Sequence, residues 1–329
     1  MSRTKRNIIY LLACLLLSAG IPVHAKSEGH ELITKMLDQV DKINYRGSFV
    51  YIHNGKMDSM EIIHAVIDGE IKEKLVSLNG EPRKVIRDHE ETTCVWPLRK
   101  LVTVDPSSFY HGIPTIVPKE LGSFDEFYQI IPRGMNRVAG QYCQVLAIRP
   151  VDNFRYGYIL CIQPDTGMLL RAKMIHPRGR VLEEVMFTEL EYLDSVNEDL
   201  LELDIDTTDF RLRRSSYAND QANPVIDNPW RFSNLPPGFS VSKVTQSRMP
   251  ASNELVKHLV LSDGVASVSV FIMKPNSPGQ IREGISQRGA INAFSTGLKD
   301  LQITVLGEVP DETVKLIGSS IEVGELNAK

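Results

Sequence analysis

Hydrophobic and polar positions alternate with a period of two through residues 47–87, which predicts successive antiparallel β-strands. In Gly47–His53, Phe49 and Tyr51 point to one side and Val50 points to the other. Asn-Gly and Asp-Gly dipeptides separate these strands, as tight hairpin turns require. Because both faces are apolar, an element, a ligand or a partner must cover the second face.

The same pattern continues and predicts a meander with few helices. Apolar residues recur every three or four positions in Glu31–Lys42, which predicts an amphipathic helix. The apolar segment Asp105–Ile131 is rich in Pro and Gly, and we expect a long irregular loop that packs on the sheet or closes over a cavity. We expect an α+β unit whose curved sheet or open barrel has further strands at Ser59–Ile67, Glu70–Leu78, Arg83–Arg87, Thr92–Pro97, Lys100–Val104, Arg137–Ala139, Tyr142–Arg149, Tyr156–Gln163, Leu169–Ile175 and Leu182–Leu190.

A chain of 329 residues exceeds the size of a typical single core, so two domains are expected. The composition becomes polar and turn-rich between Arg211 and Trp230. We therefore predict a domain over 26–212, a linker over 213–232 and a second domain over 233–329. The second domain is expected to contain strands at Phe239–Gln246, Leu255–Leu261, Ala266–Met273 and Ile303–Gly307, and a helix at Asp311–Ser320.

The start of the chain has the pattern of an export signal. A basic beginning is followed by the apolar run Ile8–Leu17 and by a small-residue cleavage site, so we expect residues 1–25 to be cut after Ala25. The alternative is a lipoprotein signal cut before Cys14, for which the remaining apolar run Ile8–Ala13 is short. No other run approaches the length of about 20 apolar residues that a membrane span needs.

Removing this signal makes the chain more acidic. The formal net charge of the whole chain is −4, and residues 1–25 contain basic residues but no acidic one. The mature chain therefore has no broad basic field, and we expect no nucleic acid as a partner.

Three of the four cysteines lie beyond the signal, so at least one thiol is unpaired or intermolecular. Cys143 and Cys161 flank a predicted hairpin, and their spacing is compatible with a disulfide between two strands. Two small buried thiols explain the same pattern equally well. Cys94 has no role that the sequence identifies.

The sequence contains no recognisable catalytic or metal-binding motif. It lacks a Cys-x-x-Cys pair, a histidine pair spaced i, i+4, a Gly-x-Ser-x-Gly elbow and a phosphate-binding loop. Glu183 and Glu184 are neighbours in a predicted strand and face opposite sides. We therefore expect no catalytic residue, no metal and no cofactor, and a hydrolase of envelope glycan or lipid is disfavoured for want of an acid and base set.

Two groups of residues point to binding instead. The apolar sheet and the loop that follows it could line a cavity for an amphiphilic lipid, although an ordinary core under a covering loop explains the same residues. The candidate residues for this cavity are Phe49, Tyr51, Ile62, Phe109, Phe124 and Phe127. The linker combines basic and aromatic residues suited to an acidic partner, and its alternative interpretation is a solvated tether. Its candidates are Arg211, Arg213, Arg214, Trp230 and Phe232.

An ordered set of short motifs runs from about residue 28 to the end of the chain. The motifs are Gly47–Tyr51, Leu78–Arg87, Arg137–Gly140, Arg155–Tyr158, Asp165–Gly167, Leu235–Phe239, Leu261–Phe271 and Val305–Pro310. Together they resemble the RseB/MucB family, the periplasmic sigma-E factor regulatory proteins of Gram-negative bacteria. The family motif does not require a cysteine at position 161.

The resemblance implies an N-terminal domain of the LolA/LolB type, an unclosed antiparallel β-barrel with helices, and a smaller C-terminal α+β domain. It implies a periplasmic protein that binds the periplasmic part of a membrane-spanning anti-sigma factor and shields it from the site-1 protease. A lipid or lipopolysaccharide signal is expected to relieve that shielding. The alternative function is a lipid or lipoprotein carrier, and whether the chain forms a homo-oligomer stays open.

Overall fold

The structure is a computed structural model. It describes residues 23–39, 42–106, 124–214, 223–224, 230–248, 255–275 and 281–323. Most of the expected export signal lies outside these residues, and the first described element, helix α2 (Val23–Gln39), includes the expected cleavage position. No helix in the described part of the chain is long and apolar enough to cross a membrane.

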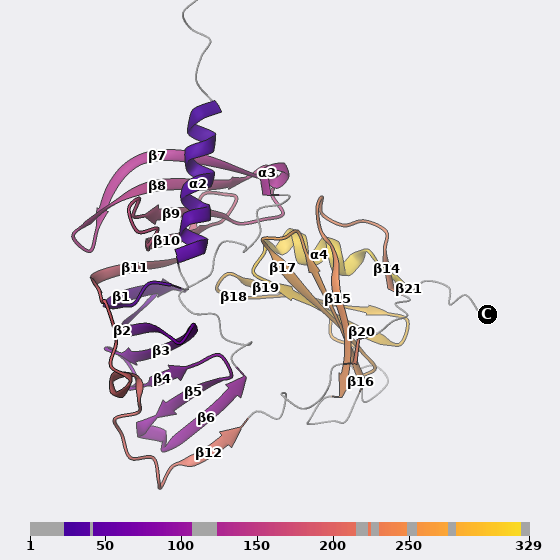
Figure 1. Cartoon of the computed structure of the whole chain (residues 1–329). Coiled ribbons are helices and arrows are strands. Elements are labelled where there is room, and N and C mark those ends of the chain that lie inside the picture. Colours follow the sequence, from indigo (N-terminus) through magenta and orange to yellow (C-terminus); the bar gives the residue numbers. More distant parts are fainter. Residues whose placement is uncertain are drawn as a thin grey trace, which may run out of the picture.

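The N-terminal unit is one 12-stranded sheet in the order β12-β6-β5-β4-β3-β2-β1-β11-β10-β9-β8-β7. Figure 1 shows it as a curved stack from β7 to β12, and these two outer strands are not paired with each other. All neighbours whose pairing is described are antiparallel except β12 and β6, so the expected unclosed antiparallel sheet is confirmed. Its strands are β1 (Tyr45–His53), β2 (Lys56–Ile67), β3 (Glu70–Ser77), β4 (Lys84–Arg87), β5 (Glu91–Trp96), β6 (Leu101–Pro106), β7 (Tyr128–Val138), β8 (Gln141–Pro150), β9 (Gly157–Ile162), β10 (Leu169–Ile175), β11 (Val181–Tyr192) and β12 (Arg211–Arg214).

Helix α2 covers the β7 end of this sheet (Figure 1). Ile33 and Met36 are buried in the same cluster as Leu146 and Leu160 of the sheet, together with Phe124 of the short helix α3 (Phe124–Phe127). The apolar stripe predicted this helix, but α2 begins before the expected Glu31 and ends at Gln39. The described part of this unit also contains two short 3-10 turns, η1 (Pro97–Arg99) and η3 (Glu198–Leu201).

Packed side chains cover the two faces of the sheet over different strands. On one face, Tyr45, Phe49, Ile62 and Phe187 of β1, β2 and β11 belong to one buried cluster. On the opposite face, Val95, Val102 and Val104 of β5 and β6 pack against Leu203, Ile205 and Phe210 of the segment that leads from β11 to β12. The second face of β1 is less enclosed, and Ile52 there is 37% exposed.

The C-terminal unit is a smaller α+β domain, as expected. Its seven-stranded sheet has the order β13-β15-β16-β17-β20-β19-β18, and β14 pairs with β21 in a separate two-stranded sheet. Helix α4 (Asp311–Ser319) packs on β19 and β20, where Val314 and Ile317 are fully buried. The strands are β13 (Asn223–Pro224), β14 (Trp230–Phe232), β15 (Ser240–Arg248), β16 (Leu255–Ser262), β17 (Ser267–Met273), β18 (Gly284–Arg288), β19 (Ile291–Leu298), β20 (Leu301–Gly307) and β21 (Ile321–Val323).

Candidate functional site

Strand β12 forms a basic outer edge of the N-terminal sheet. It pairs with β6 in parallel, from Arg211 opposite Leu101 to Arg214 opposite Val104, and all four of its residues are exposed. The Arg211 amide donates to the Lys100 carbonyl at 2.8 Å, which fixes the start of the strand. Within the described sheet β12 has a neighbour on one side only, and an edge of this kind can pair with a further strand.

The three arginines of β12 differ in their partners. Arg214 forms an ion pair with Glu91 of β5. Arg211 and Arg213 have no carboxylate within ion-pair distance among the described residues. These two side chains therefore supply most of the uncompensated positive charge of the β12 edge.

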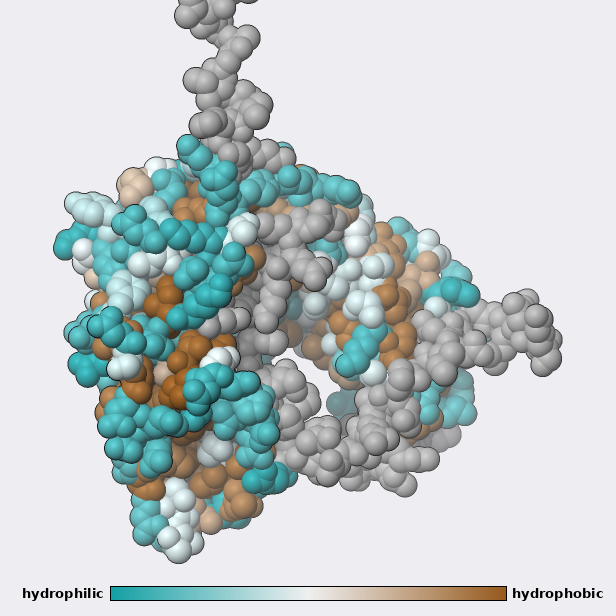
Figure 2. All heavy atoms as spheres, in the orientation of Figure 1, coloured by the Kyte–Doolittle hydropathy of each residue, from teal (hydrophilic) through white to brown (hydrophobic). Residues whose placement is uncertain are grey.

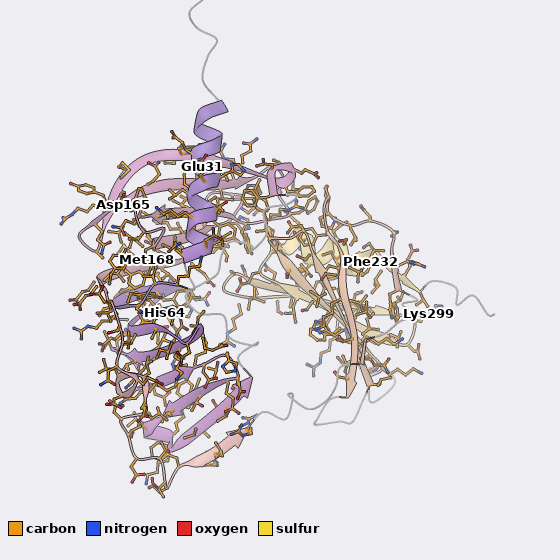
Figure 3. The ribbon with its side chains drawn as sticks, viewed as in Figure 1. Glu31, His64, Asp165, Met168, Phe232 and Lys299 are labelled. Atoms are coloured by element: carbon orange, nitrogen blue, oxygen red, sulfur yellow. A yellow bond between two sulfur atoms is a disulfide. The ribbon has the colours of Figure 1, made fainter. Side chains whose placement is uncertain are left out.

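The aromatic members of the same candidate group lie elsewhere. Trp230 is only 6% exposed and belongs to the core of the C-terminal unit, with Lys257 Nζ 5.8 Å from its ring centroid. Phe232 packs partly buried against that core, and Figure 3 shows it in the C-terminal unit. The structure thus separates these rings from the β12 arginines, and only the arginines are exposed.

The candidates for a lipid cavity fall into different clusters. Phe49 and Ile62 are buried together, and Tyr51 packs against the same cluster. The Tyr51 hydroxyl donates to Glu183 Oε2 at 2.7 Å, and burial together with this carboxylate raises the pKa of Tyr51. Phe124 lies in the cluster under α2, and Phe109 lies outside the described residues.

Phe127 lies at the contact between the two units. A Cβ added at Gly238 would be 2.3 Å from the Phe127 ring, and Gly238 has φ +82°. The contact therefore depends on a glycine at 238, both for its backbone conformation and for the close approach of the ring.

A groove of about 560 Å³ separates parts of the two units. His176, Arg178 and Arg180 of the β10–β11 hairpin line one side, and residues 285–287 of β18 line the other. Burial, followed by the two nearby arginines, lowers the pKa of His176. The groove therefore has basic side chains on one wall and an edge strand on the other.

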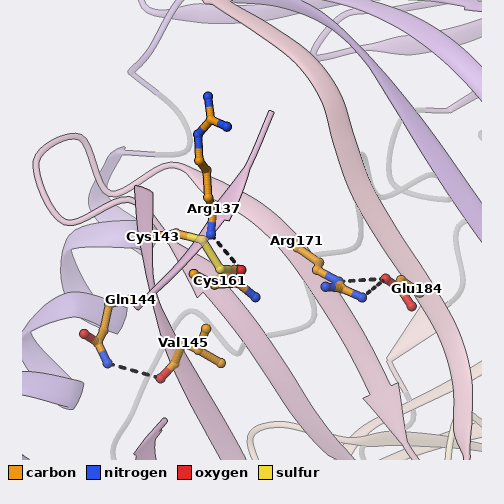
Figure 4. Close-up of a disulfide and its surroundings, with 8 residues drawn as sticks. Arg137, Cys143, Gln144, Val145, Cys161, Arg171 and Glu184 are labelled. Atoms are coloured by element: carbon orange, nitrogen blue, oxygen red, sulfur yellow. Dashed lines mark hydrogen bonds and ion pairs between the residues drawn. A yellow bond between two sulfur atoms is a disulfide. The ribbon is translucent and has the colours of Figure 1, made fainter. Parts of the chain in front are cut away.

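A disulfide joins Cys143 of β8 to Cys161 of β9, with a Cα–Cα distance of 5.3 Å (Figure 4). Both cysteines are buried in the cluster that contains Phe49 and Phe187. Cys94 is a buried free thiol, and burial raises its pKa. The disulfide fastens the strands on which the N-terminal core is built, and sequence spacing alone had left two free thiols as an equal alternative.

Among the described residues, no group of three or more His, Cys, Asp or Glu side chains is arranged to hold a metal ion. The surface of both units mixes hydrophobic and hydrophilic residues. Figure 2 shows groups of hydrophobic residues on both units, each bordered by hydrophilic ones.

Two family models match almost the whole described chain. The MucB/RseB N-terminal domain matches residues 28–207, and the MucB/RseB C-terminal domain matches residues 225–322. The chain belongs to the MucB/RseB family. Its relatives are named as regulatory proteins, so the chain is a member of a regulatory family and not of an enzyme family, as expected.

Curated relatives in this family match along nearly their full length. The sigma factor AlgU regulatory protein MucB of Pseudomonas aeruginosa is 28% identical, with 96% of each chain covered. The sigma-E factor regulatory protein RseB of Haemophilus influenzae is 26% identical over 94% of this chain and 96% of that protein. RseB of Escherichia coli K12 is 26% identical over 89% of this chain and 90% of that protein.

Solved MucB structures resemble the chain to different degrees. A crystal structure of MucB in complex with MucA(peri) has a TM-score of 0.69 and covers 92% of this chain and 100% of that chain. The Pseudomonas aeruginosa MucA/MucB complex has a TM-score of 0.70, with 91% and 100% covered. A crystal structure of MucB has a TM-score of 0.58, with 90% and 98% covered. The sequence identity is 26% in all three cases.

Proposed function

We propose that this protein is a periplasmic regulator of the envelope-stress sigma-factor response. It binds the periplasmic segment of a membrane-spanning anti-sigma factor and shields that segment from site-1 proteolysis. The observation that carries the proposal is the match, along the whole length of both domains, to MucB solved in complex with MucA(peri).

The β12 edge is the docking surface that we propose for the N-terminal unit. An extended segment can add a strand to an exposed sheet edge through backbone hydrogen bonds. The uncompensated charges of Arg211 and Arg213 favour an acidic segment there and speed its association. Leu212, which is 60% exposed between them, offers an apolar contact on the same edge.

Shielding requires only that the bound segment be inaccessible to the protease. A lipid or lipopolysaccharide signal would relieve it by binding more tightly to a form of the protein with lower partner affinity. A tenfold release needs about 1.4 kcal/mol of coupling, which corresponds to roughly two methylene groups buried in one form and exposed in the other. The candidate contacts for such an amphiphile are Phe49, Tyr51, Ile62, Phe109, Phe124 and Phe127. Since Phe49, Ile62 and Phe124 are buried in two separate clusters, an amphiphile would reach them only in a different form of the protein.

Binding is tested by biolayer interferometry with the periplasmic segment of the anti-sigma factor from the same genome. Reversing two charges at the edge, Arg211→Glu with Arg213→Glu, should weaken binding about tenfold, since each exposed ion pair contributes ~0.2–1 kcal/mol and its reversal adds repulsion of similar size. The matched control reverses Arg133 and Arg137 on β7, the opposite edge of the same sheet, and should leave affinity unchanged.

Shielding is tested by digesting the segment with the purified site-1 protease. Wild-type protein should slow cleavage in proportion to the fraction of segment bound, and the edge variant should protect less at equal concentration. The proposal fails when wild-type protein does not retain the segment. N-terminal sequencing of the exported protein separately tests cleavage after Ala25.

A further inference from the structure

A buried arginine of the N-terminal unit is held by the C-terminal unit. Arg155 lies in the loop between β8 and β9 and is 0% exposed. Its Nε donates to Asp263 of the β16–β17 turn, its Nη2 donates to the Pro237 carbonyl, and its Nη1 donates to Asp152 beside it. The side chain of Asp263 is also 0% exposed. Both charges of this interdomain pair are therefore removed from water.

Aromatic rings from both units enclose the guanidinium. Its carbon lies 4.5 Å from the centroid of Phe127 and 5.9 Å from that of Tyr128 in the N-terminal unit. On the other side it lies 5.2 Å from the centroid of Phe239 in the C-terminal unit. Cation–π contacts of this kind gain strength when water is excluded.

The residues beside Arg155 make a second set of contacts. The Tyr156 hydroxyl lies 3.0 Å from the carbonyl oxygens of both Ala290 and Val309, and it accepts from Asn292 Nδ2 at 3.0 Å. Thr313 Oγ1 of α4 donates to the Phe154 carbonyl at 2.7 Å. One short loop of the N-terminal unit thus reaches four separate segments of the C-terminal unit.

The energetics of this contact favour one arrangement of the units over others. Removing two charges from water costs about as much as their attraction returns, so a buried pair adds little net stability. An arrangement that keeps Arg155 or Asp263 buried without its partner is strongly unfavourable, by contrast. We define Arg155, Asp263 and the Pro237 carbonyl as the interdomain clasp, and its effect is to specify how the units are placed.

We propose that Arg155 is a positioning residue that, through the interdomain clasp, holds the two units in the arrangement that binds the anti-sigma segment. This inference rests on the proposed function. It is supported by the whole-chain similarity to MucB: the TM-score is 0.69 and 0.70 for the two structures named as complexes with MucA, and 0.58 for the structure named only as MucB, at equal sequence identity.

Two substitutions break the clasp in different ways. Arg155→Met removes the charge and keeps an unbranched apolar side chain. Asp263→Asn removes the negative charge. It keeps a side-chain oxygen that can accept the hydrogen bonds that the Val265 and Ala266 amides donate to Asp263 Oδ1 at 2.8 and 2.7 Å. The matched control is Arg171→Met, which breaks an ion pair with Glu184 inside the N-terminal unit.

The experiment measures small-angle X-ray scattering and segment affinity on the same purified full-length proteins. If breaking the clasp lowers the fraction of protein in the binding arrangement from near one to about one tenth, the affinity for the segment falls about tenfold. We expect this loss for both clasp variants, together with a larger radius of gyration, and neither change for the control. Thr313→Val, which removes only the bond to Phe154, should give smaller changes in the same direction.

The outcomes separate the two proposals. Clasp variants that bind as tightly as wild type, or that bind weakly with unchanged scattering, would overturn the positioning role while the proposed function stands. Wild-type protein that fails to bind the segment would refute the proposed function and the positioning role with it. If Arg155→Met does not fold, Asp263→Asn and Thr313→Val carry the same comparison.

Discussion

Reduction of the Cys143–Cys161 disulfide should destabilise the N-terminal unit by about 3 kcal/mol. The two cysteines are 18 residues apart in the sequence. In the chain-entropy description, closing a loop of this length removes roughly 11 cal/mol/K from the unfolded state, or about 3 kcal/mol at 25 °C. The effect is expected to arise in the unfolded chain, because both cysteines are buried in the folded core and we expect reduction to leave their packing in place.

The chain provides a separate fluorescence reporter for each unit. It has two tryptophans, Trp96 in β5 and Trp230 in the C-terminal core. Trp230→Phe keeps an aromatic ring in that core and leaves Trp96 to report the N-terminal unit alone. Urea unfolding of this protein, oxidised and after reduction in denaturant followed by refolding, then gives the two free energies of unfolding.

A paired control separates the disulfide from other effects of the reductant. Cys94→Ala removes the free thiol, so that only the disulfide responds to reduction. In the same background, Cys143→Ala with Cys161→Ala should unfold identically with and without reductant. A difference below about 1 kcal/mol between oxidised and reduced protein would refute the loop-entropy reasoning.

Three further changes have defined outcomes. Gly47→Ala should destabilise the N-terminal unit by about 1–3 kcal/mol in urea unfolding, because its Cβ would lie 2.3 Å from the Glu189 carbonyl. Ile317→Ala should lower the free energy of unfolding of the C-terminal unit by about 2–5 kcal/mol, because this side chain is fully buried, and Trp230 fluorescence measures the change. Burial and Lys243 lower the pKa of His258 in the folded state, so stability should fall as pH drops below 6.5, and His258→Gln should flatten that slope.

The first strands were predictable because local signals agree there. The period-two pattern predicted strands that match the observed β1, β2 and β3 to within a few residues at each end. Asn54 and Gly55 adopt φ of 51° and 70°, the left-handed conformation that an Asn-Gly hairpin turn requires. Such turns and alternation depend only on neighbouring residues, so the sequence specifies them directly.

Strand β12 was not predictable by the same reasoning. Arg211–Arg214 has no apolar alternation, and its four exposed residues bury nothing that a pattern could reveal. It is a strand because β6, more than 100 residues earlier, offers a free parallel edge. The sequence therefore shows a basic cluster across the expected boundary at 212 and 213, but no local pattern marks the edge strand that the structure has there.

For Trp230 and Phe232 the sequence suggested an exposed binding role, but the structure packs them in or against the core of the C-terminal unit. Trp230 and Phe232 follow a polar, turn-rich segment, which favoured an exposed binding role. In the structure β14 pairs with β21 near the end of the chain, and this pairing buries Trp230 in the C-terminal core. Sequence gives no local signal for a pairing between strands about 90 residues apart.

In the proposed function, the interdomain clasp couples the binding of an amphiphile to the binding of the anti-sigma segment. Binding free energies are reciprocal, so an amphiphile that weakens partner binding must itself be weakened by the partner to the same degree. Such coupling needs two arrangements of the protein with different affinities, and Arg155 with Asp263 makes the observed one specific. A variant without the clasp should therefore lose partner affinity and also lose most of its response to the amphiphile, because the equilibrium that the amphiphile shifts has already moved.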